Sequence, residues 1–289
     1  MVSTKELEKL VNGLRIIDDV LFRMIASDPL VCQEILRVLL DDDNLEVKEV
    51  TTQERLVSLH REVILDALCT LGDGKLCNIE VQKDDGNDDI RRVRFHAAAV
   101  TMNKTPKGTD FALIPTVKVL YITEYDVFGN GQSITRMTRC VKQGEKYVPV
   151  EDGEDIIFAN ATVRDGSRAS ELLELFLKTD EIHDERFPQL CNGFNRYKKV
   201  KGGKEAMCNA VEEYAKEYAK EYAKEYAKEY AKEYAKEYAI EKNAKIIIEM
   251  SEEFGLTEEA VLEKLQEKLN ISSSQAEEYW REYHAPSEI

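Results

Sequence analysis

The 289-residue chain lacks any apolar run close to the roughly 18 residues that a membrane span requires. Its first residues, MVSTKELEKL, contain no apolar core of the kind found in signal peptides. The cysteines show no CxxC spacing anywhere in the sequence. We therefore expect reduced, buried thiols in a cytoplasmic protein with no membrane partner, rather than disulfides or a zinc site.

The chain also lacks an excess of positive charge, since 56 Asp and Glu residues against 40 Lys and Arg residues give a formal net charge of −16. This balance argues against indiscriminate nucleic-acid binding, which depends on neutralising phosphates with Lys and Arg. A local basic patch can still dock a polyanion while acidic residues elsewhere keep the molecule soluble. The sequence has no phosphate-binding Gly-x-x-x-x-Gly-Lys-Ser/Thr loop and no Gly-x-Ser-x-Gly motif, so neither ATP dependence nor acyl-transfer chemistry is indicated.

The apolar and turn-forming residues predict an α/β fold. The pattern favours a mixed central sheet flanked by helices, with a βαβ crossover through a helix near 90–102. Asp28-Pro29 is typical of a helix start. The other expected elements are helices at 14–26, 171–178 and 187–198, a helix ending near 41–44, and strands at 45–51, 117–123, 132–140 and 155–162.

The C-terminal third has a different character, because the tetrapeptide AKEY repeats from Glu213 onward. A four-residue step turns a helix by about 400°, so the tyrosine stripe advances about 40° per repeat. Such a stripe cannot form the fixed seam of a coiled coil. We expect an α/β domain over 1–200, a long solvated helix over 201–250 that acts as a spacer or in self-association, and a small helical segment over 251–289.

The most informative feature is a hairpin signal formed by residues 62–71 and 75–83 around Gly72-Asp73-Gly74. If the turn centres on Asp73, paired residues have numbers that sum to 146. Asp66 then lies opposite Glu80, and Gln82 shares the face of Glu80. The other face is expected to be core and carries Leu65, Ala67, Cys69, Cys77, Ile79 and Val81.

Two carboxylates directly opposite each other repel unless a cation or a proton lies between them. Hard divalent ions such as Mg²⁺ bind carboxylate oxygens at this kind of separation. The pair therefore predicts a metal site, although one face of an antiparallel hairpin is often simply exposed to water.

The arrangement resembles the Rpn-type recombination-promoting nucleases, or putative transposases, of the PD-(D/E)xK superfamily. In that family an Asp, a hairpin turn and Glu-x-Gln form the nuclease motif. The resemblance covers roughly residues 14–200. Its matching stretches are 18-DDVLFRMI-25, 64-ILDALC-69, 78-NIEVQ-82, 91-RRVRFHAA-98, 118-KVLYITEYDVFG-129 and 152-DGEDIIFANA-161.

The resemblance implies a metal-dependent DNA endonuclease associated with recombination, transposition or mobile-element conflict. Asp66 and Glu80 would hold Mg²⁺ or another divalent cation such as Mn²⁺ or Ca²⁺, and Gln82 would orient a water or contact the scissile phosphate. A further acidic ligand is expected from an N-terminal helix. Glu34 is the first candidate for it and Asp19 the second.

Arg91, Arg92 and Arg94 are the expected DNA contacts, since arginine forks suit phosphate oxygens. Alternatively, these arginines neutralise the acidic run 84–89 just upstream. His96 could assist proton transfer or serve structurally. Glu124 and Asp126 follow a strand end, where Asp126 could support the site, although a turn-forming role is favoured.

A function of another class remains open at this point. The chain could be an interaction protein built on a catalytically decayed nuclease core and acting through its helical C-terminal tail. That tail could also mediate homo-oligomer formation. Metal-independent behaviour would favour this alternative, whereas cleavage of DNA in the presence of Mg²⁺ would favour the enzyme.

Overall fold

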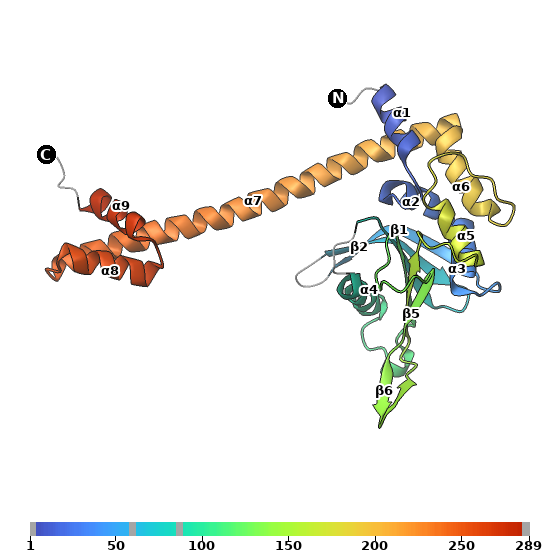
Figure 1. The fold of residues 1–289 in the computed structure, drawn as a ribbon, viewed down its shortest axis with the longest axis horizontal. Helices are drawn as coiled ribbons and strands as arrows, with labels where there is room; N and C mark the ends of the chain where they lie inside the picture. Colours follow the sequence, from blue (N-terminus) through green and yellow to red (C-terminus); the bar gives the residue numbers. More distant parts are fainter. Residues whose placement is uncertain (1–3, 58–61, 85–88, 285–289) are drawn as a thin grey trace. The chain divides into compact units, whose positions relative to one another are not determined.

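A computed structural model describes residues 4–57, 62–84 and 89–284 of the chain (Figure 1). The chain divides into two compact units, Met1–Tyr214 and Ala215–Ile289. The division falls within one long helix, whereas the sequence pattern predicts a first boundary at residue 200. Among the described helices, none is long and apolar enough to cross a membrane.

A six-stranded mixed sheet forms the centre of the first unit, as the sequence predicts. Its strand order is β1-β2-β3-β4-β8-β5. The β1–β2–β3 portion is antiparallel, β3, β4 and β8 run parallel, and β5 returns antiparallel to β8. The strands are β1 (Val47–Val57), β2 (Glu62–Leu71), β3 (Leu76–Gln82), β4 (Val117–Thr123), β5 (Ile134–Met137) and β8 (Glu154–Asn160).

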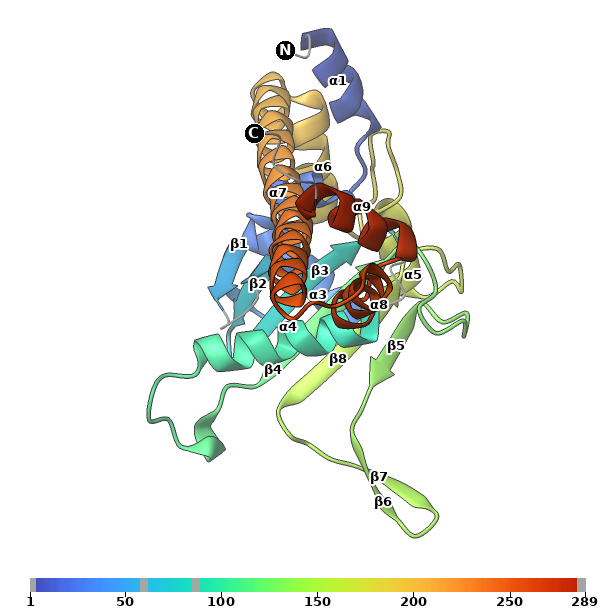
Figure 2. The same ribbon diagram turned by 90° about the vertical axis from the view of Figure 1, so that its left-hand side faces the viewer.

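Helices cover both faces of this sheet, which gives the α/β architecture expected from the sequence (Figure 2). The crossover helix α4 (Asp89–Lys104) joins β3 to the parallel strand β4, so the predicted βαβ unit is confirmed. The remaining helices of this unit are α1 (Thr4–Gly13), α2 (Asp19–Ala26), α3 (Pro29–Leu40), the short 3₁₀ turn η1 (Phe111–Leu113), α5 (Arg168–Leu175) and α6 (Pro188–Lys199).

The two sheet faces carry separate hydrophobic clusters. Ala67, Cys69 and Ile79 pack with α2, α3 and α6 on one face, while Leu68 packs with α4 on the other. Leu65 is buried as expected but belongs to the α4 cluster, so its predicted face is wrong. The alternation of β2 changes phase at Asp66, next to the point where Gln53 of β1 adopts a positive φ of 56°.

The predicted helix over 14–26 is only partly confirmed, because within this range the helix α2 covers Asp19–Ala26 alone, and the preceding helix α1 was not predicted. α1 ends at Gly13 and α2 begins at Asp19, because Asp18 terminates the intervening turn. The Asp18 carboxylate accepts a hydrogen bond of 2.7 Å from the Arg15 backbone N–H. Short acidic side chains commonly compete with the helix for backbone donors in this way. By contrast, the predicted start of α3 is confirmed, since Asp28 accepts from Leu30 N and Pro29 occupies the first helical position.

A buried lysine fastens α1 to the rest of the unit. Lys198 of α6 is 4% exposed, and its Nζ donates to the carbonyl oxygens of Val11, Asn12 and Leu14 at 2.9, 2.6 and 2.7 Å. These carbonyls lie at or just after the end of α1, where the last four C=O groups have no partner within the helix. Lys198 therefore supplies a cation where the helix dipole favours one.

A two-stranded ribbon extends from the sheet and was not separately predicted (Figures 1 and 2). It consists of β6 (Cys140–Gln143) and β7 (Lys146–Pro149), whose residues are all exposed. The sequence pattern predicts a strand over 132–140, whereas β5 ends at Met137. Gly144, with a φ of 63°, allows the tight turn between the two strands.

The second unit contains the distal part of α7 (Lys201–Glu253) with α8 (Glu258–Leu269) and α9 (Ser273–Tyr283). The repeat is helical and Tyr218, Tyr230, Tyr234 and Tyr238 are 56–64% exposed, which confirms a solvated helix. Helix α9 begins with a capping box formed by Ser272 and Gln275. The small apolar core consists of Ala244, Ile248, Val261, Leu265, Ala276 and Trp280.

Candidate active site

The hairpin register places Asp66 next to Glu80 at the point where strand pairing stops. The four ladder pairs between β2 and β3 all sum to 146, as predicted, and the last of them is Ala67–Ile79. Beyond this pair, the carboxylates of Asp66 and Glu80 take the place of backbone carbonyl oxygens as acceptors for the opposite strand. Asp66 Oδ2 accepts from Val81 N at 3.0 Å, and Glu80 Oε1 is 3.4 Å from Asp66 N. Each acid therefore faces the backbone of the opposite strand.

Both acids are buried, and each residue is 6% exposed. The pKa of Asp66 is raised well above the usual value, first by burial and then by the negative charges of Glu80 and Asp19. The hydrogen bond from Val81 and the charge of Arg23 oppose this shift but do not cancel it. The cluster therefore carries more negative charge than its surroundings compensate, and such a site favours a proton or a cation.

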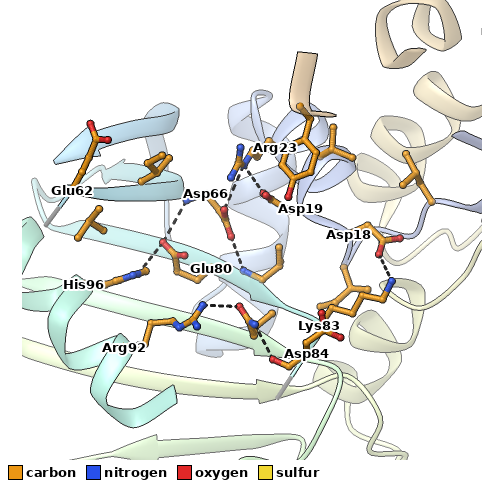
Figure 3. Close-up of a pocket in the computed structure, with 18 of the residues that line it drawn as sticks. Asp18, Asp19, Arg23, Glu62, Asp66, Glu80, Lys83, Asp84, Arg92 and His96 are labelled. Carbon is orange, nitrogen blue, oxygen red and sulfur yellow. Dashed lines mark hydrogen bonds and ion pairs between the residues drawn. The ribbon is translucent and has the colours of Figure 1, made fainter. Parts of the chain in front are cut away.

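Asp19 joins this cluster from α2, together with Arg23 one turn later (Figure 3). Arg23 pairs with Asp19, and its Nε lies 3.5 Å from Asp66 Oδ1. Burial raises the pKa of Asp19, while Arg23 and hydrogen bonds from Asp66 and Tyr214 lower it. The second-ranked candidate from the sequence is thus the acidic residue that the fold brings to Asp66.

Glu34, the first candidate for the additional ligand, lies elsewhere. Its carboxylate accepts hydrogen bonds from Gln189 N at 3.2 Å and Leu190 N at 2.7 Å, at the start of α6. An acid in this position satisfies free N–H groups and complements the helix dipole. Glu34 is therefore a helix cap and does not line the pocket that contains Asp66.

Helix α4 supplies the opposite side of the cluster. His96 Nδ1 lies 3.4 Å from Glu80 Oε1, and Asn78 of β3 donates to the same oxygen at 2.7 Å. Gln82 is held at both ends, since its Oε1 accepts from Arg92 at 3.2 Å and its Nε2 donates to the Asp84 carbonyl at 2.8 Å. Gln82 consequently links the arginine-rich helix to the acidic strand.

An open pocket of about 2000 Å³ lies over these side chains. Arg91 and Arg94 are exposed on its wall, and within the described part of the chain neither has a carboxylate partner. The alternative role of these arginines is to neutralise the acidic run 84–89. Two acids of that run, Asp85 and Asp88, lie outside the described residues. The basic residues that line the pocket are Lys9, Arg23, Lys83, Arg91, Arg92 and Arg94.

Glu124 and Asp126 have structural partners outside this pocket. Glu124 forms a bidentate ion pair with Arg15, with N–O distances of 2.5 and 2.7 Å. Asp126 accepts from Gly131 N and Phe128 N, and these backbone hydrogen bonds, that from Gly131 foremost, lower its pKa. The turn-forming role favoured for Asp126 is confirmed.

The acids suit a divalent ion by donor type, because carboxylate oxygens are the ligands that Mg²⁺ and Mn²⁺ prefer. Over residues 4–57, 62–84 and 89–284, however, no three His, Cys, Asp or Glu side chains are gathered closely enough to hold a metal as they stand. Arg23 instead contacts Asp19 and Asp66. A metal at this position would compete with that guanidinium.

Comparisons with protein-family models, with curated proteins and with solved structures find no match. The resemblance to the recombination-promoting nucleases therefore rests on the sequence motifs alone.

Two residues of the site were missed from the sequence. Arg23 had a usable signal, since it follows Asp19 by four residues on a helix and i,i+4 pairs of opposite charge commonly form. Tyr214 had none, because it begins a run of identical repeats. Only the fold distinguishes it, by placing it beside Asp19 and Arg23.

Proposed function

We propose that the protein is a metal-dependent DNA endonuclease that hydrolyses phosphodiester bonds at the Asp66–Glu80 site. The observation that carries this proposal is the buried pair Asp66 and Glu80, with the pKa of Asp66 raised well above its usual value, beneath a pocket with arginines on its wall. Strongly perturbed acids in a cleft are typical of functional sites. The motif resemblance supplies the reaction class and associates it with recombination, transposition or mobile-element conflict.

Asp66 and Glu80 would hold Mg²⁺ or Mn²⁺, and Asp19 is placed to contribute a further carboxylate. The bound ion would supply Lewis-acid stabilisation of the negative charge that develops on the phosphate. In the reaction a water oxygen would form a new bond to phosphorus, the bond from phosphorus to the leaving oxygen would break, and the proton released by the water would be balanced by one taken up by the leaving oxygen. Arg91 and Arg94 would bind flanking phosphates, while Arg92 orients Gln82 toward the reacting group.

Purified protein is expected to nick supercoiled plasmid in the presence of Mg²⁺ or Mn²⁺ and to lose this activity in EDTA. Glu80→Gln keeps the oxygen that accepts from Asn78 but removes the charge, so it should abolish nicking. Glu62→Gln is a suitable control, because Glu62 lies on the same strand pair and pocket but pairs with Arg55. Nicking by Glu80→Gln at the unsubstituted rate would exclude this site.

DNA affinity tests the arginine wall separately from chemistry. Replacing both Arg91 and Arg94 by alanine should weaken binding and reduce the slope of log K against log salt by about 2, one for each lost phosphate contact. The double variant Arg168→Ala/Arg186→Ala removes the same charge from exposed positions outside the pocket. Equal losses in the two double variants would show that only overall charge matters.

One observation favours the second candidate, an interaction protein built on a nuclease-like core. Arg23 already compensates part of the charge on Asp19 and Asp66, so the acids have a partner without a metal. In that case the helical second unit would carry the activity, through another protein or a second copy of the chain. If calorimetry shows no binding of divalent ions and the protein does not nick DNA, the interaction-protein hypothesis is supported over the endonuclease hypothesis.

A further inference from the structure

The acidic cluster contains its own cation. Arg23 projects from α2, and its Nε is the atom in contact with both Asp19 and Asp66. The Arg23 side chain is 16% exposed and the Asp66 side chain 9%, so water screens their interaction only in part. Figure 3 shows Asp19, Arg23 and Asp66 turned toward one another beside Glu80.

Tyr214 contacts the Arg23 guanidinium with the face of its ring. The Arg23 guanidinium carbon lies 5.7 Å from the centre of the Tyr214 ring, within the range of a cation–π interaction. The Tyr214 hydroxyl also lies close enough to Asp19 to lower the pKa of that carboxyl. Tyr214 is half-buried, whereas Tyr218, four residues on in the same repeat, is 64% exposed. The first repeat tyrosine is therefore part of the pocket wall, unlike Tyr218.

We propose that Arg23 is a tethered counter-cation, which occupies the carboxylate cluster of the metal-free protein and competes with a divalent ion for Asp19 and Asp66, and that Tyr214 keeps it there. The inference deepens the proposed function and rests on its metal site. A guanidinium and a divalent ion need the same carboxylate oxygens. The free energy of breaking the Arg23 contacts is therefore subtracted from the free energy of ion binding, as in any coupled equilibrium.

Arg23 is accordingly a positioning residue that sets the ion concentration at which the site fills. It also prevents the buried acids from repelling one another when no ion is bound. This double role predicts opposite effects of its removal in the absence and presence of divalent ions, which a purely structural ion pair would not produce.

The first test is calorimetric titration of the full-length protein with MnCl₂ and with MgCl₂. Arg23→Met, which retains much of the apolar stem, should bind the ions at least about tenfold more tightly, because a unit charge in contact with the ligand oxygens contributes at least that much. Arg15→Met is the matched control. It breaks the similarly buried Arg15–Glu124 pair outside the pocket and should leave ion affinity unchanged. Equal or weaker ion binding by Arg23→Met would overturn the inference.

Thermal unfolding provides a second readout and does not depend on cleavage. In EDTA, Arg23→Met should melt at least about 3 °C below the unsubstituted protein, since it leaves buried acids without a counter-charge. In saturating Mn²⁺ this difference should close or reverse. A difference that is the same in both buffers would show that Arg23 is structural. If Arg23→Met does not fold, Arg23→Lys, which keeps the charge but loses the planar fork, should show a smaller shift in the same direction.

Tyrosine variants test the outer contact. Tyr214→Ala should tighten Mn²⁺ binding by roughly threefold, because it removes a cation–π contact from Arg23. Tyr218→Ala is the control and should change nothing. Identical Mn²⁺ affinities for the Tyr214 and Tyr218 variants would remove Tyr214 from the proposal.

Failure of the inference can be told from failure of the proposed function. If the unsubstituted protein binds Mn²⁺ and cleaves DNA but Arg23→Met binds no more tightly, only the inference falls. If neither protein binds Mn²⁺, both fall together.

Discussion

Asp66→Asn is expected to lose cleavage by more than about 100-fold, a loss larger than that typical of outer-shell partners of a metal site. The substitution keeps the shape of the side chain and an oxygen that can accept from Val81 N. Only the charge and one oxygen are lost. A measured rate of plasmid nicking in Mg²⁺ therefore reports on the chemistry of the carboxylate rather than on the packing of the hairpin.

The same variant is expected to be more stable than the unsubstituted protein at neutral pH. Burial, followed by Glu80 and Asp19, raises the pKa of Asp66 above its ordinary value of 3.8. The folded protein thus holds a proton where the unfolded chain has released it, so stability falls as pH rises through this window. Asparagine does not titrate, and we expect a gain of roughly 0.5–2 kcal/mol at pH 7 that disappears near about pH 4.

Denaturant unfolding at several pH values checks this expectation, and Asp89→Asn is a control of similar burial. Asp89 is 5% exposed, but its Oδ1 accepts from the hydroxyls of Tyr121 and Tyr125, and the residue lies outside the pocket. That variant should retain cleavage. An Asp66→Asn protein that cleaves normally, or that is less stable at pH 7 than at pH 4 relative to the unsubstituted protein, would contradict the proposed charge balance.

The second large effect is expected from Lys198→Met, which should destabilise the first unit by about 3 kcal/mol. Hydrogen bonds that involve a charged group contribute about 1.5–3 kcal/mol each. The three carbonyls that Lys198 binds lose their donor together, although the end of α1 can fray and recover part of the loss in water. Burial lowers the pKa of Lys198 to about 8, so the amine is still protonated at pH 7.

Lys199→Met provides the matched control for this prediction. Lys199 is the next residue on α6, but its side chain is 58% exposed and its Nζ lies 3.6 Å from Glu181. Exposed pairs of this kind contribute at most about 1 kcal/mol. If the two variants unfold at the same denaturant concentration, Lys198 does not fasten α1. Because Lys9 and Leu10 of α1 also line the pocket, loss of α1 should further weaken DNA binding.

The features predicted correctly from the sequence depend on neighbours along the chain. The Gly72-Asp73-Gly74 turn determines the register of β2 and β3, and Gly74 indeed adopts a positive φ of 84°. Asp28 and Pro29 specify the start of α3 by local hydrogen bonding and a restricted φ. The β4 strand was found because a run of apolar residues is buried on both faces of a sheet.

The features that were missed depend on contacts between distant segments. Glu34 caps a helix that begins more than 150 residues later, as the separation of 155 positions to Gln189 indicates. No local pattern distinguishes such a cap from a metal ligand. Leu65 was assigned to the wrong face because alternation assumes a regular strand, while β2 changes phase at Asp66 beside the positive φ of Gln53.

The hydrogen bonds at the end of the β2–β3 ladder have a consequence for how this protein can evolve. Asp66 and Glu80 both accept backbone N–H groups there, so each has a part in holding the strands as well as a charge. An amide side chain can accept the backbone N–H group and hold the strands without carrying a charge. A single nucleotide change that converts one of these acids to its amide could therefore abolish catalysis and leave the fold intact or more stable. Such a protein could then evolve a function that does not involve cleavage.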